Sequence, residues 1–249
     1  MAILAKKYND MKTITFTVVL AILATLLQAQ TRGTLPGEYY FSGQWYLNSQ
    51  NQYVYAIWRT SDNGQTLALQ YSSTTFPEQG YSMNLVSDAT PGVLYATTQN
   101  KLYVSHDYAK TWMFVENTGL DGRYSAGESS GVIYKYHNSE GAKFYKSENY
   151  GLSFNLVNQT VYGFPEVGNV SNNVYILTGR TYPVYEKIIL RSQDSGYNFD
   201  TVKINDEIIG SYPPLPTLTR GVSVGEVYFV SWRNAYYSIY HSENDGQTF

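Results

Sequence analysis

The chain has 249 residues, of which 43% are hydrophobic and 15% charged, and its formal net charge is −3. This composition is that of a globular protein, and it lacks the excess of Lys and Arg that binds a nucleic-acid backbone, so we expect no nucleic-acid partner. The absence of cysteine excludes disulfides, thiolate chemistry and a lipid-anchored N-terminal cysteine. The 26 Tyr and 20 Gly favour strands joined by tight turns.

Residues 1–30 differ from the rest of the chain and predict a signal peptide. Met11 and Lys12 precede an uncharged, mostly apolar run, Ile14–Leu27, which leads into "LQAQ". This run is shorter than the ~20 residues that a bilayer span needs and fits the core of a signal peptide. We expect residues 1–10 to be an extension, cleavage to follow Ala29, and the mature protein to be secreted or at the cell surface without a membrane span. A short membrane anchor is the alternative.

The mature part, residues 31–249, contains an eight-residue segment five times. These octets are "TSDNGQTL" (60–67), "SHDYAKTW" (105–112), "SENYGLSF" (147–154), "SQDSGYNF" (192–199) and "SENDGQTF" (242–249). They share the pattern Ser/Thr-x-Asp/Asn-x-Gly-x-Ser/Thr-aromatic, and their third residues follow one another at intervals of 42 to 50 residues. Five copies at nearly constant spacing are typical of a repeat architecture.

Each octet has the residues of a structural hairpin turn. The acidic or amide side chain accepts hydrogen bonds from backbone N–H groups, and the Gly supplies a positive φ. The final aromatic begins the outgoing strand and packs inward. The residues expected in these structural roles are Asp62, Gly64, Asp107, Trp112, Asn149, Gly151, Phe154, Asp194, Gly196, Phe199, Asn244, Gly246 and Phe249.

Strand-like runs surround the octets. Each octet follows a run such as "YVYAIWR" or "KIILRS", and further runs such as "GVLYATT" and "GEVYFVSW" precede these. Each repeat therefore reads as about four short strands, which is the pattern of one propeller blade. We predict an all-β propeller with about five four-stranded blades. Because the chain ends in the fifth octet, before a fourth strand, we expect an incomplete ring truncated at its C-terminus.

The octets carry a family resemblance. They resemble the Asp-box, or BNR, repeat of sialidase-like and sortilin-like propellers, over about Tyr39–Phe249. In that family the box is the turn between the third and fourth strands of a blade. This chain departs from the pattern at Leu67, which replaces the aromatic, at Ala109, which replaces Gly, and at Asn198, which replaces Ser or Thr. The Cys-free, Tyr-rich mature chain also resembles exported Bacteroidetes proteins.

The octets do not have the residues of a metal site or a catalytic centre. A Ca²⁺ loop needs several oxygen ligands and a late bidentate Glu, whereas the octet pattern offers one acidic or amide group. Glycoside hydrolysis needs two spaced carboxyl groups or an activated Tyr. The resemblance to sialidases implies an Arg-Ile-Pro motif, which is absent, and three arginines, of which only Arg123 and Arg220 are expected near innermost strands. We predict no catalytic residue, metal or cofactor.

Ligand binding is expected at the loops that join consecutive blades, because these reach the central face of a propeller. They are "TTFPEQGYS", "TGLDGRYSAGE", "VYGFPEVGN" and "SYPPLPTLTRG". Their side chains suit sugars or peptides, and the candidate ligand-binding residues are Glu78, Asp121, Arg123, Tyr124, Glu166 and Arg220. We predict a secreted, non-catalytic propeller module that binds carbohydrate or protein at the cell surface. The alternatives are a fragment of a sialidase- or xyloglucanase-like glycoside hydrolase and a sortilin-like peptide-binding receptor.

Overall fold

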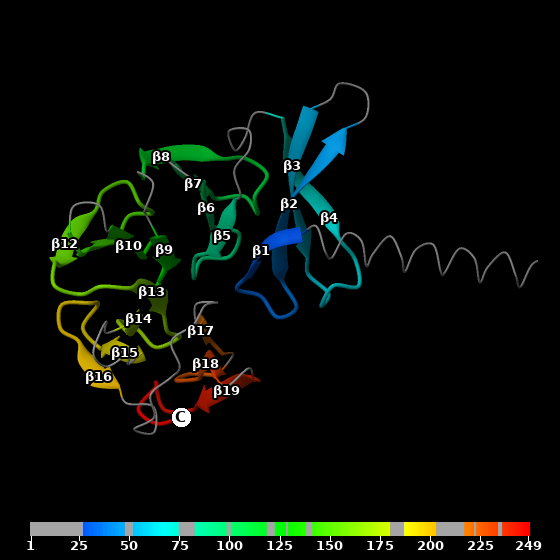
Figure 1. Cartoon of the computed structure of the whole chain (residues 1–249). Coiled ribbons are helices and arrows are strands. Elements are labelled where there is room, and N and C mark those ends of the chain that lie inside the picture. The colour runs from blue at the N-terminus through cyan, green and yellow to red at the C-terminus, as the bar shows by residue number, and fades with distance from the viewer. Residues whose placement is uncertain are drawn as a thin grey trace, which may run out of the picture. The chain divides into compact units, whose positions relative to one another are not determined.

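The protein is an all-β propeller with five blades, as predicted (Figure 1). The computed structural model describes residues 27–47, 52–74, 83–98, 101–118, 123–127, 129–137, 141–179, 187–202, 217–221, 223–233 and 236–249. Nineteen strands lie in these segments, and none of the segments holds a helix long and apolar enough to cross a membrane. The chain divides into two compact units, Met1–Leu85 and Val86–Phe249.

The first unit holds blade 1, an antiparallel sheet with its strands in chain order. The strands are β1 (Leu27–Arg32), β2 (Tyr39–Leu47), β3 (Gln52–Thr60) and β4 (Ala68–Ser73). The expected cleavage after Ala29 would remove the first half of β1 and leave Gln30, Thr31 and Arg32 paired with β2.

The other four blades also keep their strands in chain order, and the boundary between the two units falls within β5. Blade 2 has β5 (Asn84–Ser87), β6 (Leu94–Thr97), β7 (Lys101–Ser105) and β8 (Met113–Asn117). Blade 3 has β9 (Arg123–Ala126), β10 (Ile133–His137), β11 (Lys143–Ser147) and β12 (Asn155–Asn158). Blade 4 has β13 (Phe164–Val167), β14 (Val174–Gly179), β15 (Lys187–Ser192) and β16 (Asp200–Val202). In blade 5 the described residues form β17 (Thr217–Arg220), β18 (Val227–Arg233) and β19 (Tyr236–Ser242).

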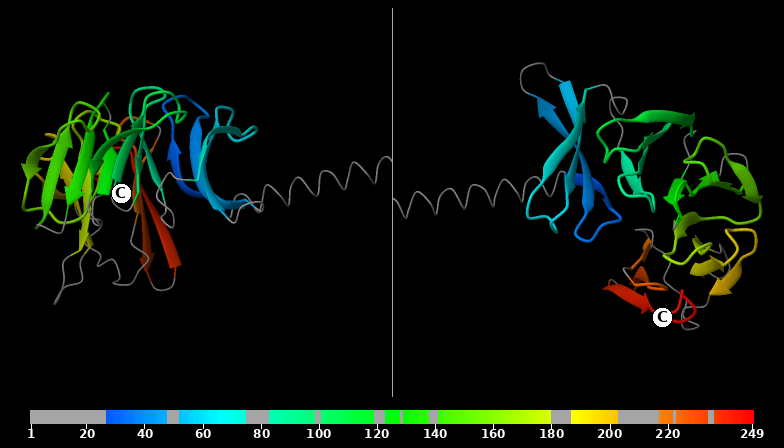
Figure 2. Two further views of the ribbon diagram at one scale, coloured as in Figure 1. Left: turned by 90° about the horizontal axis from the view of Figure 1, so that it is seen from above. Right: turned by 180° about the vertical axis from the view of Figure 1, so that it is seen from behind.

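Consecutive blades of the second unit pack through shared hydrophobic clusters, in which the octet aromatic of the later blade takes part. Phe154 joins the cluster of blades 2 and 3, Phe199 that of blades 3 and 4, and Phe249 that of blades 4 and 5. The first strands β9, β13 and β17 lie next to one another at the inner side of the blades, and the last strands lie outside (Figures 1 and 2). The inner strands therefore form the central face of this unit.

Every octet closes its turn with the same hydrogen-bond network. The hydroxyl group of the first octet residue donates to Oδ1 of the third residue, and in octet two Ser105 Oγ lies 2.9 Å from Asp107 Oδ1. The same hydroxyl oxygen accepts the backbone N–H groups of the third and fifth octet residues. The seventh residue donates its N–H to the same Oδ1, at 2.8 Å from Thr111 to Asp107. The third residue therefore acts as the acceptor at the centre of the turn.

The structure explains how the turn tolerates its departures from the pattern. The fourth and fifth residues of each octet both have positive φ, and Ala109 adopts a φ of 67° at the position where the other octets have Gly. A left-handed Ala costs about 1–2 kcal/mol relative to Gly. Asn198 replaces the Ser or Thr without loss of contacts, because its Nδ2 donates to Asp194 Oδ2 at 2.7 Å.

A second turn, which the octet pattern did not predict, recurs between the first and second strands of each blade. Its third residue has a positive φ and is Gly37, Gly92, Gly131, Asn172 or Gly225. The carbonyl of this residue accepts the N–H of the fourth octet residue of the same blade, as in Asp245 to Gly225 at 2.8 Å. Each octet is therefore tied to the first turn of its own blade.

Replacing the three octet aspartates by Asn is expected to make the fold less sensitive to acid. Hydrogen bonds from Thr66 and Thr60 lower the pKa of Asp62 to about 2. Burial alone would raise the pKa of Asp107 and Asp194, but hydrogen bonds from their turns outweigh it and lower both. Because these pKa values are lower in the folded chain, the carboxylates stabilise it above about pH 4, and this stabilisation is lost as the pH falls through the folded values.

The measurement is urea unfolding of wild type and the D62N/D107N/D194N variant at a series of pH values. Asn already occupies this position in octets three and five, where Asn149 Oδ1 and Asn244 Oδ1 accept the same N–H groups. We expect similar stability near pH 6 and a smaller loss for the variant between pH 4 and pH 2. If the free energy of unfolding falls equally with pH in the two proteins, the lowered pKa values of Asp62, Asp107 and Asp194 are contradicted.

Candidate functional site

The candidate site of the second unit lies on its inner strands. Of the six predicted ligand-binding residues, Glu78 and Asp121 lie outside the described residues. Arg123 begins β9, Glu166 lies in β13, and Arg220 ends β17. Because β13 contacts both β9 and β17, these three charged residues belong to neighbouring strands.

Glu166 is an exposed residue of β13 that lies between blade 3 and blade 5. Partial desolvation of its carboxyl group raises its pKa from 4.5 to about 7, and the positive charge of Arg220 offsets part of that rise. Because water reaches part of the side chain, its desolvation is incomplete and we expect only a small effect on stability. The Glu166 carboxyl group, with a pKa raised to about 7, therefore lies within electrostatic reach of the Arg220 guanidinium group.

The position of Glu166 in the repeat explains its proximity to Arg220. In blade 3 the residue at the same place in the first strand is Ser125, whose Oγ accepts the Val167 N–H of the next blade at 3.1 Å. Glu166 is the corresponding residue of blade 4, and Arg220 of blade 5 corresponds to Val167. The repeat therefore directs a side chain of one inner strand toward the next inner strand. In blades 4 and 5 the two residues concerned, Glu166 and Arg220, carry opposite charges.

Tyr124, the remaining predicted ligand-binding residue, makes its side-chain hydrogen bond with blade 2. Its hydroxyl donates to Glu116 Oε1 of β8 at 3.0 Å, and its ring contacts Phe154 edge to face. Burial and the nearby Glu116 carboxylate raise the pKa of Tyr124. Lys135 Nζ completes this cluster at 2.9 Å from Glu116 Oε1. Tyr124 therefore holds blade 3 against blade 2.

Glu166→Gln is expected to reduce the pH dependence of stability between about pH 4.5 and pH 7. The pKa of Glu166 is higher in the folded chain than its ordinary value of 4.5. Its stabilising contribution is therefore complete below pH 4.5 and is lost as the pH rises through 7. Urea unfolding at several pH values measures the effect, and Glu243→Gln in octet five, an exposed residue, is the control. Equal slopes for E166Q and wild type would refute the raised pKa.

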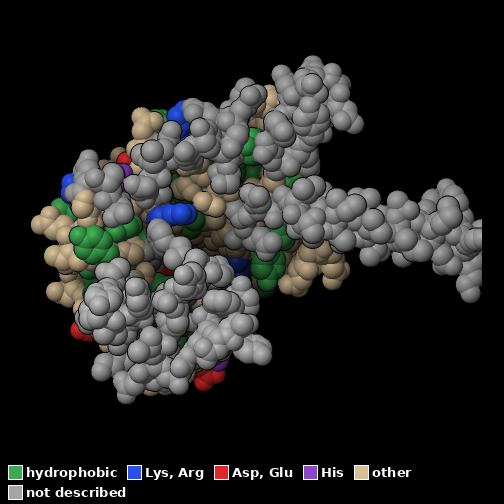
Figure 3. All heavy atoms as spheres, in the orientation of Figure 1, with side chains coloured by type: hydrophobic (Ala, Val, Ile, Leu, Met, Phe, Trp, Pro, Cys, Tyr) green, Lys and Arg blue, Asp and Glu red, His purple; other side chains and the backbone are tan. Residues whose placement is uncertain are grey.

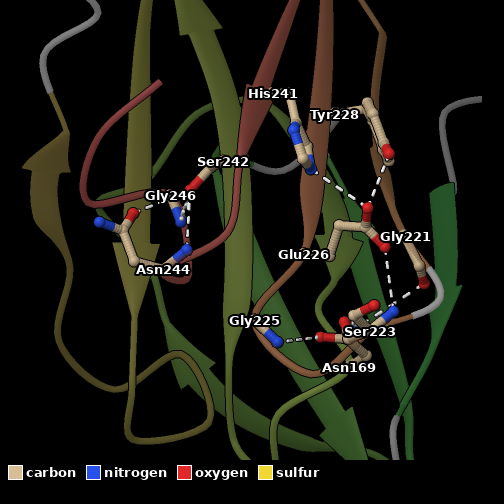
Figure 4. Close-up of polar contacts among 10 residues, drawn as sticks. All are labelled: Asn169, Gly221, Ser223, Gly225, Glu226, Tyr228, His241, Ser242, Asn244 and Gly246. Atoms are coloured by element: carbon tan, nitrogen blue, oxygen red, sulfur yellow. Dashed lines mark hydrogen bonds and ion pairs between the residues drawn. The ribbon is translucent and has the colours of Figure 1, made fainter.

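A second cluster of polar side chains, which was not among the predicted site residues, joins a carboxylate, a tyrosine and a histidine on one sheet face. In blade 5, Glu226 Oε1 accepts the Tyr228 hydroxyl at 2.7 Å and lies 3.1 Å from His241 Nε2 (Figure 4). The Tyr228 and His241 rings stack at 4.6 Å. The shared motif Gly-Glu-x-Tyr, which also occurs at 37–40, was the available sequence signal.

On the face drawn in Figure 3, the described Lys, Arg, Asp and Glu side chains are scattered among hydrophobic and uncharged polar ones. Within the described segments, no group of three or more His, Asp or Glu side chains could hold a metal ion. The inner-strand pair of Glu166 and Arg220 is therefore the candidate site.

Comparisons with known proteins identify the fold. No family model matches the sequence, and neither does any curated protein. The GH74 enzyme of Niastella koreensis is similar in structure, with a TM-score of 0.57 and 15% identity over 89% of this chain. The GH74 xyloglucanase of Xanthomonas campestris has a TM-score of 0.55 and 16% identity over 87% of this chain. The match covers 36% and 37% of these two enzymes, little more than a third of their length.

A third similar structure is of closer length. The α-L-arabinanase of Penicillium chrysogenum, solved in complex with arabinobiose, has a TM-score of 0.57 and 15% identity. The match covers 90% of this chain and 80% of the arabinanase. At these identities the likeness is one of fold, which is the β-propeller.

Proposed function

We propose that the chain is a secreted, non-catalytic propeller of the Asp-box type that binds a carbohydrate on the inner strands of its second unit. The observation that carries this proposal is the Glu166 and Arg220 pair on the adjacent strands β13 and β17. A carboxylate and a guanidinium group side by side offer both acceptors and donors to sugar hydroxyl groups. Arg123, exposed at the start of β9, extends this polar surface to a third blade.

A carbohydrate is favoured over a protein ligand by the polar side chains on the inner strands and by the proteins of similar fold. Small-molecule sites need a few convergent polar groups on a rigid scaffold, and inner strands satisfy this requirement. Two of the similar folds belong to a xyloglucanase and to an arabinanase that was solved with arabinobiose. These names describe those proteins, and they guide the choice of probes for this one.

The test is binding and turnover by the full chain with xyloglucan and arabinan oligosaccharides. We expect saturable binding by calorimetry, no release of reducing ends, and a loss of affinity of about tenfold or more in E166Q and R220Q, since a charged hydrogen bond contributes ~1.5–3 kcal/mol. E243Q, which changes an exposed acidic residue of octet five, serves as the matched control. Binding that survives both inner-strand substitutions would place the ligand elsewhere.

The second candidate function is glycoside hydrolysis, and the raised pKa of Glu166 favours it. A carboxyl group with a pKa of about 7 is suited to general acid catalysis at neutral pH. Hydrolysis by the usual routes needs a second carboxyl group, and Glu166 is the only acidic residue on the first strands β5, β9, β13 and β17. Turnover of any glycoside that E166Q abolishes would replace the binding proposal by this one.

A further inference from the structure

Three positions of the repeat are neighbours on one face of each blade. They are a tyrosine in the second strand, the residue two places before it, and the residue that directly precedes the octet. The tyrosine pairs with the residue before the octet in every blade, as Tyr175 pairs with Arg191 in blade 4. Residues two places apart along a strand lie on the same face, so the third side chain joins the other two.

In blades 1 and 5 a carboxylate connects the three side chains. Glu38 Oε1 accepts the Tyr40 hydroxyl at 2.9 Å and lies 2.6 Å from Arg59 Nε. Glu226 Oε1 does the same for the tyrosine and the histidine of blade 5 (Figure 4). Two blades therefore place one carboxylate oxygen between the donors of a tyrosine and a base.

Blade 4 keeps the tyrosine and the base but has an amide in place of the carboxylate. The three residues are Asn173, Tyr175 and Arg191. Tyr175 is completely buried and Asn173 nearly so. The Tyr175 hydroxyl, Asn173 Nδ2 and Arg191 Nε are buried atoms, and none of them has a hydrogen-bond partner among the described residues. Three buried donors therefore lie where two other blades have a carboxylate oxygen.

The surrounding charges do not supply the missing acceptor. Arg191 Nη1 donates to the Asp245 carbonyl oxygen of octet five at 3.1 Å, and none of the described residues forms an ion pair with Arg191. The Asp245 carboxylate faces the first turn of blade 5, where a Cβ on Gly225 would lie 3.3 Å from its Oδ1. Burial raises the pKa of Tyr175 to about 12, and the Asp245 carboxylate adds to the rise. The Arg191 charge and the Asn173 amide lower this pKa, so both lie close to the hydroxyl group.

The chemistry of this group suits a small anion. A buried water molecule needs acceptors for its own hydrogen atoms, whereas an anion accepts from every donor and also offsets the guanidinium charge. The ring of Tyr175 is closely packed, since a Cβ on Gly168 would lie 2.9 Å from it and a Cβ on Gly246 3.2 Å. A monatomic anion therefore fits better than phosphate or sulfate.

We propose that Asn173, Tyr175 and Arg191 bind a chloride ion where octet five covers blade 4. The ion takes the place that the Glu38 carboxylate oxygen has in blade 1, and it accepts from the hydroxyl, the amide and the guanidinium group. Gly246 packs on the Tyr175 ring and Arg191 bonds to octet five, so the ion lies next to the contact between blades 4 and 5. Binding to the folded chain alone stabilises it against unfolding.

The experiment is urea unfolding of the full chain over a range of NaCl concentrations, with sodium gluconate keeping the ionic strength constant. Once chloride exceeds its dissociation constant, the unfolding constant of wild type is expected to fall about tenfold for each tenfold rise in chloride. Crystals grown in sodium bromide locate the ion directly. An anomalous-scattering peak is expected beside Arg191 Nε.

Two variants remove the site in opposite ways. Asn173→Glu restores the carboxylate of blades 1 and 5, and Arg191→Gln removes the positive charge. Both are expected to lose the dependence on chloride, N173E without loss of stability. Lys146→Gln is the matched control, because Lys146 directly precedes octet three and pairs with Glu148 at 2.6 Å, outside the site. K146Q should keep the wild-type dependence on chloride.

The proposal is overturned if chloride and gluconate stabilise wild type equally, since the Asn173 carbonyl oxygen would then be the acceptor for its two neighbours. A wild-type dependence on chloride that persists in N173E or R191Q would place the ion elsewhere and also overturn it. If one of these variants does not fold, the other decides. A bromide map without a peak at Arg191 would contradict the site whatever the variants show.

Discussion

Asp88→Ala is expected to lower the free energy of unfolding of the second unit by about 3–5 kcal/mol, the cost of removing one partner from a buried polar network. Asp88 is completely buried between blades 2 and 3. Its carboxylate accepts the Thr90 N–H at 2.8 Å and the Tyr95 hydroxyl at 3.1 Å in its own blade. It also accepts the Gly131 N–H of the next blade at 3.0 Å.

The size of this effect follows from what the substitution leaves behind. Alanine would leave the Tyr95 hydroxyl and the Gly131 N–H buried without an acceptor, and each such group costs about 1–3 kcal/mol. It would also remove a hydrogen bond that joins two blades. Blade 4 meets the same need with an amide, since Asn169 Oδ1 accepts the Gly225 N–H at 2.8 Å. Asp88→Asn is therefore expected to recover part of the loss.

Urea unfolding followed by tyrosine and tryptophan fluorescence measures both variants. Asp107→Ala, in the octet of the same blade, is the matched control. Its partners Lys110 and Thr111 donate from an exposed turn, where water can replace the lost acceptor, and Ser105 is the one buried donor. The Asp88 variant should therefore lose clearly more stability than the Asp107 variant. A loss in D88A no larger than in D107A would show that the contact between the blades is unimportant.

The fold could be predicted because the octet has nearly the same sequence in each blade. Its third residue needs an acceptor oxygen and its fifth a left-handed backbone, which leaves few residue types for either position. The first turn of each blade is equally regular in space, yet it is "LPGE" in blade 1 and "VSNN" in blade 4. Asn172 adopts the same left-handed backbone conformation as Gly37, so this turn has no common sequence pattern from which it could be predicted.

The candidate site was harder to predict because a strand sends neighbouring residues to opposite faces. Arg123 and Tyr124 are adjacent in the sequence, but Arg123 is exposed while Tyr124 turns to Glu116 of the previous blade. Only the register in which the strands pair decides which of two such adjacent residues faces the site.

Gly196→Ala is expected to destabilise the second unit by about 2–5 kcal/mol, from ~1–2 kcal/mol of left-handed strain and ~1–3 kcal/mol of overpacking. Gly196 has a φ of 91° in octet four. A Cβ at this position would collide with the ring of Phe144 in blade 3. That ring is completely buried and cannot withdraw, because Tyr134 stacks on it at 5.4 Å and Phe199 meets it edge to face.

Two other substitutions separate strain from crowding. Gly141 has a φ of 88° in the same unit, and a Cβ there would meet nothing within 4 Å, so Gly141→Ala should cost only the strain. Ala109→Gly relieves that strain in octet two and should stabilise the unit by about 1 kcal/mol. Urea unfolding ranks the three variants. If G196A and G141A lose equal stability, octet four does not press on blade 3, and contact between an octet and the preceding blade is not what holds these blades together.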